Sequence, residues 1–424
     1  MSNVRIIVKT QVANFLITSV YYLYSKNKGN LVFSFLRKVY YSLLKKFGMS
    51  VMPILDFDTY HTNYNSVEVI PIKSKRIGLS GNCVFLDNIE KQKTIPMPLP
   101  DIRMHKLSDV TIFGNSDIVV DLQKKIVINN ECYNHDKDLF YVDGMLYRDK
   151  NNLCILRTNF KQSPEKIDDG IMINGKFSYN YFHQIYENLI RLLLLEEVNI
   201  PLAVPILIDE KVKQISSFQS ILVCLNTSKR NVIYLKSDKQ YDIKNLYYLE
   251  HINKLSPHVV NWDDTSYRHF IYDPYYVNKM SDVCLRDKST ALFPKRFYIS
   301  RKNAVHRKFN DDDIAKALVP YGFQVVYPEE HSFAEQMALF SGAEFIIGGT
   351  GAAFANLLFC NKGAKVVIIN PIANHIQLPV FSIIAYIRKC QLYYYEPQAT
   401  SSDSVHADCM VDTQDFLSKL QKII

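Results

Sequence analysis

The chain has 424 residues, of which 48% are hydrophobic and 22% are charged, with 14 glycines, 16 prolines and a formal net charge of +8. This composition is typical of a folded globular protein with two domains, and it excludes collagen-like, low-complexity and largely disordered chains. The eight cysteines include no Cys-x-x-Cys pair, which argues against a zinc cluster and favours reduced thiols in a cytosolic compartment.

The first 50 residues form a basic arm. Eight basic residues and no acidic residue precede Asp56, so the arm accounts for the whole excess charge and the rest of the chain is neutral. Its apolar runs, residues 12–17 and 31–36, are shorter than the ~20 residues that a membrane-spanning helix needs. We expect amphipathic helices on an anionic membrane surface, with packing on the neighbouring domain as the alternative. A signal peptide is disfavoured because more basic residues follow the apolar stretch, and nucleic acid because no binding motif accompanies the charge.

Residues 51–280 are predicted to form an N-terminal domain. Short β-branched segments separated by Gly, Asn and Asp come first, at residues 67–70, 110–113, 118–120 and 125–128. After Asp168-Asp169-Gly170 the apolar period becomes helical, and buried strands are predicted again at residues 204–208, 232–235 and 246–249. The domain is therefore expected to begin β-rich and to continue as α/β.

Residues 281–424 are predicted to form a C-terminal domain in which strands and helices alternate. The predicted strands are residues 297–300, 323–326, 344–347 and 365–369. The predicted helices are residues 311–318, 332–340, 352–359 and 413–423, the second opening with a capping box of Ser332 and Glu335. This alternation predicts right-handed βαβ units in a doubly wound parallel sheet, whose ligands bind beyond the carboxyl ends of the strands.

A glycine run lies at one such strand end. Gly349, Thr350, Gly351 and Ala352 follow an apolar strand and open a helix of small residues, so their backbone N–H groups are candidates to bind a diphosphate. No Gly-Lys-Ser/Thr follows, which excludes a Walker A loop. An acidic residue is also missing about 20 positions on, which argues against a nicotinamide nucleotide. A tight turn with a purely structural role is the alternative.

Basic residues follow the first strand of the same sheet. Arg301 ends that strand and Arg307 comes shortly after, so both are candidates to neutralise a diphosphate leaving group. Surface ion pairs with residues 311–313, which are all aspartates, are the alternative. These aspartates lie at the start of a predicted helix. Acidic residues are common there because they cap the helix and interact favourably with its dipole. We therefore predict no metal site.

A second polar group lies on the predicted helix from residue 180. Asn180, His183, Glu187 and Arg191 share one face at spacings of three and four. A histidine and a carboxylate one turn apart are a plausible acid–base pair. A surface ion pair between Glu187 and Arg191 is the alternative.

Together these motifs resemble glycosyltransferase family 61, in its bacterial branch of capsular polysaccharide biosynthesis proteins. The resemblance spans residues 107–371. It rests on Asn180-Tyr181-Phe182-His183, Glu187, Arg191, Tyr298 to Arg301, Arg307, Gly322-Phe323, Phe333 to Gln336, Gly348 to Gly351, Asn356 and Phe359.

The resemblance implies a GT-B architecture, in which two Rossmann-like domains face a cleft and the C-terminal one holds a nucleotide-sugar. It implies an inverting, metal-independent hexosyl- or pentosyltransferase without a cofactor. Glu187 would be the catalytic base and His183 would orient it or the acceptor, with Asn180 and Asn356 elsewhere in the cleft. Arg301, Arg307 and the backbone after Gly349 would stabilise the diphosphate.

Two positions depart from the family pattern. Many relatives have histidine where this chain has Thr350, and many have glutamate where it has Ile368. We expect an enzyme that builds a surface glycan of capsular or lipopolysaccharide type on a glycan or lipid-linked acceptor, at the cytoplasmic face of the cell membrane. A non-catalytic nucleotide-sugar-binding protein or scaffold is the alternative.

Overall fold

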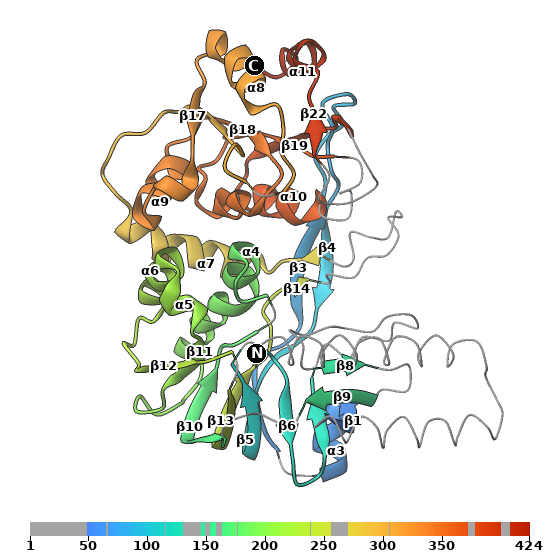
Figure 1. The fold of residues 1–424 in the computed structure, drawn as a ribbon, viewed down its shortest axis with the longest axis vertical. Coiled ribbons are helices and arrows are strands. Elements are labelled where there is room, and N and C mark those ends of the chain that lie inside the picture. Colours follow the sequence, from blue (N-terminus) through green and yellow to red (C-terminus); the bar gives the residue numbers. More distant parts are fainter. Residues whose placement is uncertain are drawn as a thin grey trace, which may run out of the picture. The chain divides into compact units, whose positions relative to one another are not determined.

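The computed structural model describes residues 49–64, 67–114, 116–129, 146–148, 153–157, 163–175, 177–237, 239–255, 270–304, 306–371, 378–399 and 408–424 (Figure 1). The predicted basic arm lies outside these residues except for its last two. Within the described part of the chain, no helix is long and apolar enough to cross a membrane.

Contacts divide the chain into two compact units. Unit 1 is formed by the described parts of Met1–Glu68, Leu107–Asp169 and Leu235–Leu246; unit 2 is formed by the described parts of Val69–Lys106, Gly170–Tyr234 and Tyr247–Ile424. Every predicted site residue lies in unit 2. The domain boundary predicted between residues 280 and 281 stays a prediction.

Unit 1 is a small, mostly β structure. It contains β1 (Met49–Leu55), α3 (Phe57–Tyr64), β6 (Val119–Asp121), β7 (Ile126–Ile128), β8 (Leu146–Arg148), β9 (Leu153–Arg157) and parts of β2 (Val67–Lys73), β5 (Ile102–Phe113), β10 (Glu165–Met172) and β13 (Gln240–Leu249). Strand β1 pairs in parallel with β7 and antiparallel with β9, and β6 is antiparallel to β5 and β7. The Tyr60 hydroxyl donates to Asp121 at 2.6 Å, which ties α3 to β6. The strands predicted at 110–113, 118–120 and 125–128 are confirmed.

The C-terminal part of unit 2 contains a five-stranded parallel sheet. Its strands are β16 (Arg296–Ile299), β17 (Gln324–Val326), β18 (Phe345–Gly349), β19 (Lys365–Ile369) and β20 (Gln391–Tyr395). They are ordered β17-β16-β18-β19-β20, and every neighbouring pair is parallel. The predicted parallel α/β sheet is confirmed, and β20 adds an edge strand that was not predicted.

Helices cover both faces of this sheet. They are α8 (Asp311–Leu318), η5 (Val319–Tyr321), η6 (Pro328–Glu330), α9 (Phe333–Ser341), η7 (Ala352–Phe359), α10 (Leu378–Ile387) and α11 (Thr413–Leu420), with the short strands β21 (Gln398–Ala399) and β22 (Cys409–Met410). Tyr298 and Ile347 pack in one core cluster with Ile314 of α8 and Phe416 of α11. Their neighbours along the strands belong to the larger cluster with α9, η7 and α10. This alternation of faces is expected for a sheet buried on both sides.

The remainder of unit 2 is also α/β. It contains β3 (Arg76–Gly81), β4 (Thr94–Leu99), α4 (Tyr181–His183), η1 (Gln184–Asn188), η2 (Leu189–Glu196), β11 (Ile206–Asp209), α5 (Lys211–Gln214), α6 (Ser216–Leu225), β12 (Val232–Leu235), β14 (Lys254–Leu255), β15 (Phe270–Ile271), α7 (Pro274–Cys284) and η4 (Leu285–Asp287). The end of β10 pairs in parallel with β11. Phe182 of α4 packs at 5.9 Å between ring centroids on Phe381 of α10, so both α/β parts of unit 2 share one core.

A buried ionic cluster lies in this part of unit 2. The Glu250 carboxylate, directly after β13, accepts from Nη2 of Arg103 at 2.9 Å and contacts Nε2 of His105 at 3.0 Å. Burial alone would raise the pKa of Glu250, but hydrogen bonds from His105 and Arg103 bring that pKa below its ordinary value. The cluster therefore favours the ionised carboxylate.

Candidate functional site

The strand order places the glycine loop at the point where the sheet reverses direction. The chain passes from β16 to β17 on one side and then crosses to β18 on the other side of β16. The connections that follow β16 and β18 therefore leave the sheet in opposite directions, and ligands of open α/β sheets bind at the carboxyl ends of the strands at such a point. Arg301 follows β16 and Gly351 follows β18, so the sequence placed both residues correctly at these strand ends.

The glycines of the loop leave room for Arg301. A Cβ atom built on Gly351 would lie 2.2 Å from Nη1 of Arg301, and one on Gly349 would lie 2.4 Å from the Phe309 ring. Neither separation is compatible with an ordinary van der Waals contact. A side chain at Gly349 or Gly351 would therefore displace the Phe309 ring or the Arg301 side chain, which lie directly against the loop.

Backbone carbonyls hold the Arg301 guanidinium in place. Its Nε donates to the carbonyl of Arg307 at 3.1 Å and its Nη2 to the carbonyl of His306 at 2.8 Å. Burial, with a further contribution from the nearby Arg307 charge, lowers the pKa of Arg301 to about 10. Two cations held close together in a partly buried position are costly without an anion. This arrangement is suited to binding one.

Arg307 belongs to the same loop. Its φ of 58° lies in the left-handed region, and burial lowers the pKa of its guanidinium. Its Nε is buried without a hydrogen-bond partner among the described residues. The structure therefore brings Arg307 next to Arg301, as expected from the sequence.

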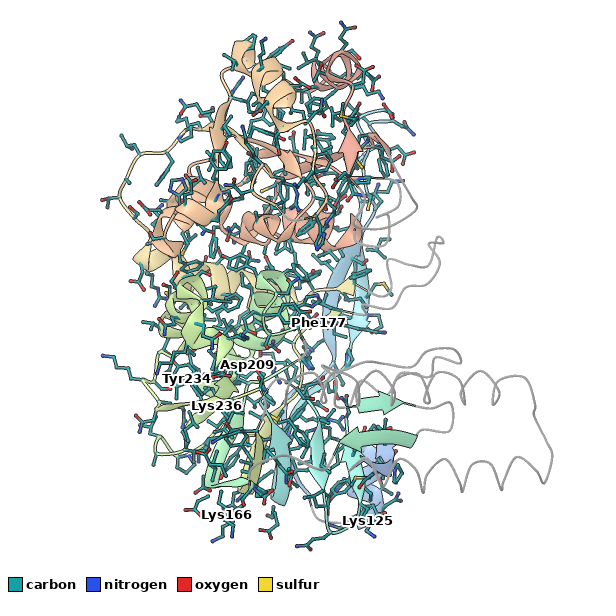
Figure 2. The ribbon with its side chains drawn as sticks, viewed as in Figure 1. Lys125, Lys166, Phe177, Asp209, Tyr234 and Lys236 are labelled. Carbon is teal, nitrogen blue, oxygen red and sulfur yellow. The ribbon has the colours of Figure 1, made fainter. Side chains whose placement is uncertain are left out.

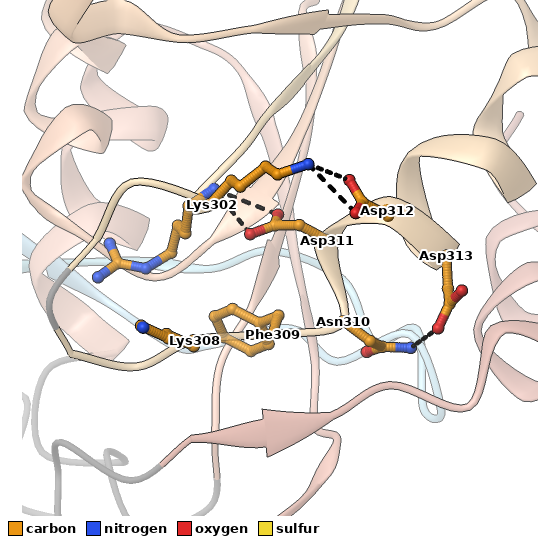
Figure 3. A pocket seen from close by; sticks show the side chains of 8 residues that line it. Lys302, Lys308, Phe309, Asn310, Asp311, Asp312 and Asp313 are labelled. Carbon is orange, nitrogen blue, oxygen red and sulfur yellow. Dashed lines mark hydrogen bonds and ion pairs between the residues drawn. The ribbon is translucent and has the colours of Figure 1, made fainter.

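The aspartates at the start of α8 have structural roles. Asp311 is buried, accepts the Arg301 backbone N–H at 3.1 Å, and accepts a hydrogen bond from the Tyr298 hydroxyl. Asp312 pairs with Lys302 at 2.9 Å, and Asp313 accepts from the Asn310 amide at 3.2 Å (Figure 3). The three carboxylates thus have separate protein partners. No group of three or more His, Cys, Asp or Glu side chains arranged for a metal occurs within the described ranges.

These residues line a pocket beside Arg301. Its volume is about 340 Å³ and it is lined by Arg301, Lys302, Lys308, Phe309, Asn310, Asp311, Asp312 and Asp313 (Figure 3). The Phe309 ring also meets Gly349. The pocket therefore adjoins the glycine loop and combines three basic side chains, three aspartates and an aromatic ring.

The helix predicted from residue 180 has an irregular centre. Asn180 caps it by accepting the backbone N–H of Phe182 at 3.0 Å, so its role in the structure is to begin the helix. A single turn of π-helix, η1, then interrupts the α-helical pattern, and η2 continues as 3-10 helix. Turns of π-helix inside helices occur frequently at functional sites. Glu187 lies in this turn.

His183 and Glu187 form the predicted pair. Nδ1 of His183 lies 2.8 Å from Oε1 of Glu187. The His183 side chain is 22% exposed and that of Glu187 is 11% exposed, so the imidazole is the more accessible group. This contact suits a neutral imidazole that donates its Nδ1 proton to the carboxylate.

Arg191 has a different environment from the one expected. It is wholly buried, and its Nη1 and Nη2 donate to the carbonyls of Leu249 and Asn174 at 3.1 and 2.6 Å. These carbonyls lie at or just beyond the ends of β13 and β10. Arg191 therefore satisfies backbone groups inside the core, so its predicted place on a polar face with His183 and Glu187 was wrong, as was the alternative of a surface ion pair with Glu187.

Asn356 connects the helix to the segment after the glycine loop. Its Oδ1 accepts from the Tyr181 hydroxyl at 2.7 Å, and its Nδ2 donates to Gln336 at 2.8 Å. The Tyr186 hydroxyl donates to the carbonyl of Ala355 at 2.9 Å. The sequence missed the roles of Tyr181 and Tyr186, because a tyrosine on an apolar face gives no sign of its hydroxyl's partner.

Thr350 and Ala352 complete the loop. Thr350 is only 1% exposed, and its backbone N–H donates to the carbonyl of Ile369 at 2.9 Å. That N–H is thus engaged by β19 in this structure. Ala352 begins η7, which confirms the helix predicted at residues 352–359 and is of the 3-10 type.

An α/β sheet with a glycine loop and an arginine at its reversal point is typical of enzymes that bind nucleotides. Residues 181–367 match the family model Glycosyltransferase 61, a segment that includes His183, Glu187, Arg301 and the glycine loop. Although it covers less than half of the chain, the match supports the predicted family. On this match the chain is a glycosyltransferase. No curated protein matches it.

Proposed function

We propose that the chain is an inverting, metal-independent glycosyltransferase of GT-B architecture, which transfers a sugar from a nucleotide-sugar to a growing surface glycan. The observation that carries the proposal is the Arg301 guanidinium, held against Gly351 at the reversal point of a parallel sheet. A nucleotide-sugar loses a nucleoside diphosphate as its sugar is transferred. Arg301, Arg307 and the glycine loop are positioned to stabilise the charge on that leaving group.

We assign the acid–base role to the His183–Glu187 pair. With the carboxylate of Glu187 fixing the proton on Nδ1, Nε2 of His183 accepts the proton of the acceptor hydroxyl as that oxygen attacks the anomeric carbon. Glu187 stabilises the imidazolium that forms. This exchanges the roles expected from the sequence, because the imidazole is more exposed than the carboxylate.

The cellular setting is also a proposal. The chain would act at the cytoplasmic face of a bacterial cell membrane, with residues 1–50 bound to anionic lipids through their basic residues. Vesicle sedimentation of the full chain and of a variant lacking residues 1–48 tests this anchor. Equal partitioning of both proteins into anionic vesicles would refute it.

A screen of nucleotide-sugars by thermal shift tests the donor. A ligand that binds only the folded state raises the apparent melting temperature, and we expect a shift with at least one nucleotide-sugar that Arg301→Ala abolishes. Lys308→Ala, which changes another basic residue of the same pocket, should keep most of the shift. A shift with no donor would favour a scaffold, and one that survives Arg301→Ala would refute the assigned diphosphate site.

A further inference from the structure

The loop between β10 and α4 is pinned at several points. A Cβ atom on Gly175 would lie 1.9 Å from Oδ1 of Asn188, so the loop backbone lies directly on the π-helical turn. Ser178 donates its hydroxyl hydrogen to the carboxylate of Asp209, at the end of β11. That carboxylate also accepts the backbone N–H of Lys211 at 2.8 Å. The loop is therefore held from two neighbouring elements.

Phe177 occupies a strained position in this loop. Its φ is 52°, a left-handed conformation that is uncommon for a bulky residue. The backbone N–H of Asn180 donates to the carbonyl of Phe177 at 2.7 Å, which closes the turn before the helix. Strain of this kind costs about 1–3 kcal/mol and gathers at functional sites. A glycine or asparagine would fit the backbone better, so the phenylalanine ring needs its own explanation.

The Phe177 ring extends an aromatic surface outward from the proposed base. Its centroid lies 5.0 Å from that of His183 and 6.3 Å from that of Tyr179, which meets it edge-on. Tyr179 is 56% exposed. Figure 2 labels Phe177 and Asp209, the ring and the anchor of this loop. Ring contacts therefore run from His183 through Phe177 to the exposed Tyr179, and we call Phe177 and Tyr179 the aromatic wall.

The chemistry of a sugar ring fits this wall. One face of a pyranose presents C–H groups without hydroxyls between them, and such a face packs on an aromatic ring, whose own face carries partial negative charge. The hydroxyls at the rim of the sugar stay free for reaction. Because the wall begins at His183, a sugar stacked on it places its rim beside the group that accepts the proton.

We propose that Phe177 and Tyr179 form an acceptor subsite in which a pyranose ring stacks on the exposed Tyr179 ring and the Phe177 ring, edge-on to it, borders the sugar on the side of His183. The subsite rests on the proposed function, since His183 gives it its place beside the reacting hydroxyl. The acceptor is then a glycan, and its terminal sugar ring packs on the aromatic wall. A peptide with a side-chain hydroxyl has no such ring and does not bind the subsite. Asp209 positions the loop through Ser178 and does not touch the sugar.

Saturation-transfer NMR on the full chain tests the subsite without a donor. The probes are methyl β-glucopyranoside, methyl β-galactopyranoside and an N-acetylserine amide. We expect saturation of at least one pyranoside and not of the serine derivative, with the largest effect on its ring C–H protons. Tyr179→Phe keeps the signal, whereas Tyr179→Ala reduces it at least fivefold. Tyr275→Ala is the matched control, because Tyr275 is also 56% exposed but begins α7.

The outcomes separate the subsite from the function on which it rests. Tyr179→Ala should raise the acceptor KM about tenfold, and the control Tyr275→Ala should change it less than twofold. If wild type releases diphosphate but saturates no pyranoside, or if Tyr179→Ala keeps the full signal, the subsite is refuted and the function stands. Pyranoside binding with no turnover of any donor would refute the proposed function and leave a sugar-binding site. Phe177→Leu checks the second ring, and equal melting temperatures confirm that each variant folds.

Discussion

Gly351→Ala is expected to disable the enzyme through Arg301. The added Cβ would lie 2.2 Å from Nη1 of Arg301, and an ordinary contact needs ~3.4 Å, so the guanidinium must move by about 1.2 Å. Arg301 is the flexible partner, since the loop backbone is fixed by the bond from Thr350 to Ile369. The movement stretches the two hydrogen bonds to backbone carbonyls that hold Arg301.

The expected loss is about a hundredfold in kcat/KM. A misplacement of ~1 Å at a positioning group costs about 10²-fold, which is about 2.7 kcal/mol of transition-state stabilisation. Two strained hydrogen bonds at about 1 kcal/mol each give a similar figure. The free energy of unfolding should fall by only about 1 kcal/mol, because the end of a long side chain gives way more easily than backbone.

Release of nucleoside diphosphate from the donor, measured at several donor concentrations, gives kcat/KM. Gly342→Ala is the control: its added Cβ would lie 3.3 Å from a single carbonyl oxygen at the end of α9, and its activity should match wild type. Because the effect acts through Arg301, the double variant with Arg301→Ala should be no worse than Arg301→Ala alone. Wild-type kcat/KM for Gly351→Ala, or additive losses in the double variant, would refute the reasoning.

Four further substitutions probe the rest of unit 2. His183→Ala should lower kcat by about 10²–10⁴-fold, as loss of a general base does, whereas Glu187→Ala should lower it by only about tenfold. Both are measured as steady-state sugar transfer. A larger loss for Glu187→Ala than for His183→Ala would show that the carboxylate is the base. Asn356→Ala should lower the free energy of unfolding, measured in urea, by about 2–4 kcal/mol, because it leaves two partners without a hydrogen bond. A decrease below ~1 kcal/mol would show that the network is dispensable. The pKa of Glu250 is depressed in the folded state. Its ionised form therefore stabilises the fold at pH values above the ordinary carboxyl pKa. This stabilisation is lost as the pH falls through the depressed pKa. Glu250→Gln should therefore lose about 3 kcal/mol at pH 7 and much less at pH 3, and equal losses at both pH values in urea unfolding would contradict this.

The C-terminal sheet could be predicted well because its physics is local. Buried parallel strands are short apolar runs bounded by polar or glycine residues, and four strands were placed within two residues of their observed ends. The capping box of Ser332 and Glu335 is present as predicted. Strand β20 was missed because Gln391–Tyr395 contains three consecutive tyrosines, which do not show the apolar pattern of the other strands.

The candidate site could be predicted only in part because its contacts are not local. Spacing of four placed Glu187 one turn from His183, and the structure confirms the contact. The same spacing put Arg191 on the exposed face, yet the π-helical turn changes the rotation after Gln184 and η2 is surrounded by core on all sides. Nothing in the sequence shows that Arg301 donates to the carbonyls of its own loop. That arrangement depends on the left-handed backbone at Arg307.

The segment after the glycine loop connects the two halves of the proposed site. Helix η7 begins beside Gly351, which lies against Arg301, and its centre accepts hydrogen bonds from Tyr181 and Tyr186. These two tyrosines flank His183 on the helix that carries the acid–base pair. A displacement of η7 would therefore move the diphosphate loop and the base together. Under the proposed function, the small residues of η7 and the buried Asn356 fix the spacing between the leaving group and the proton acceptor.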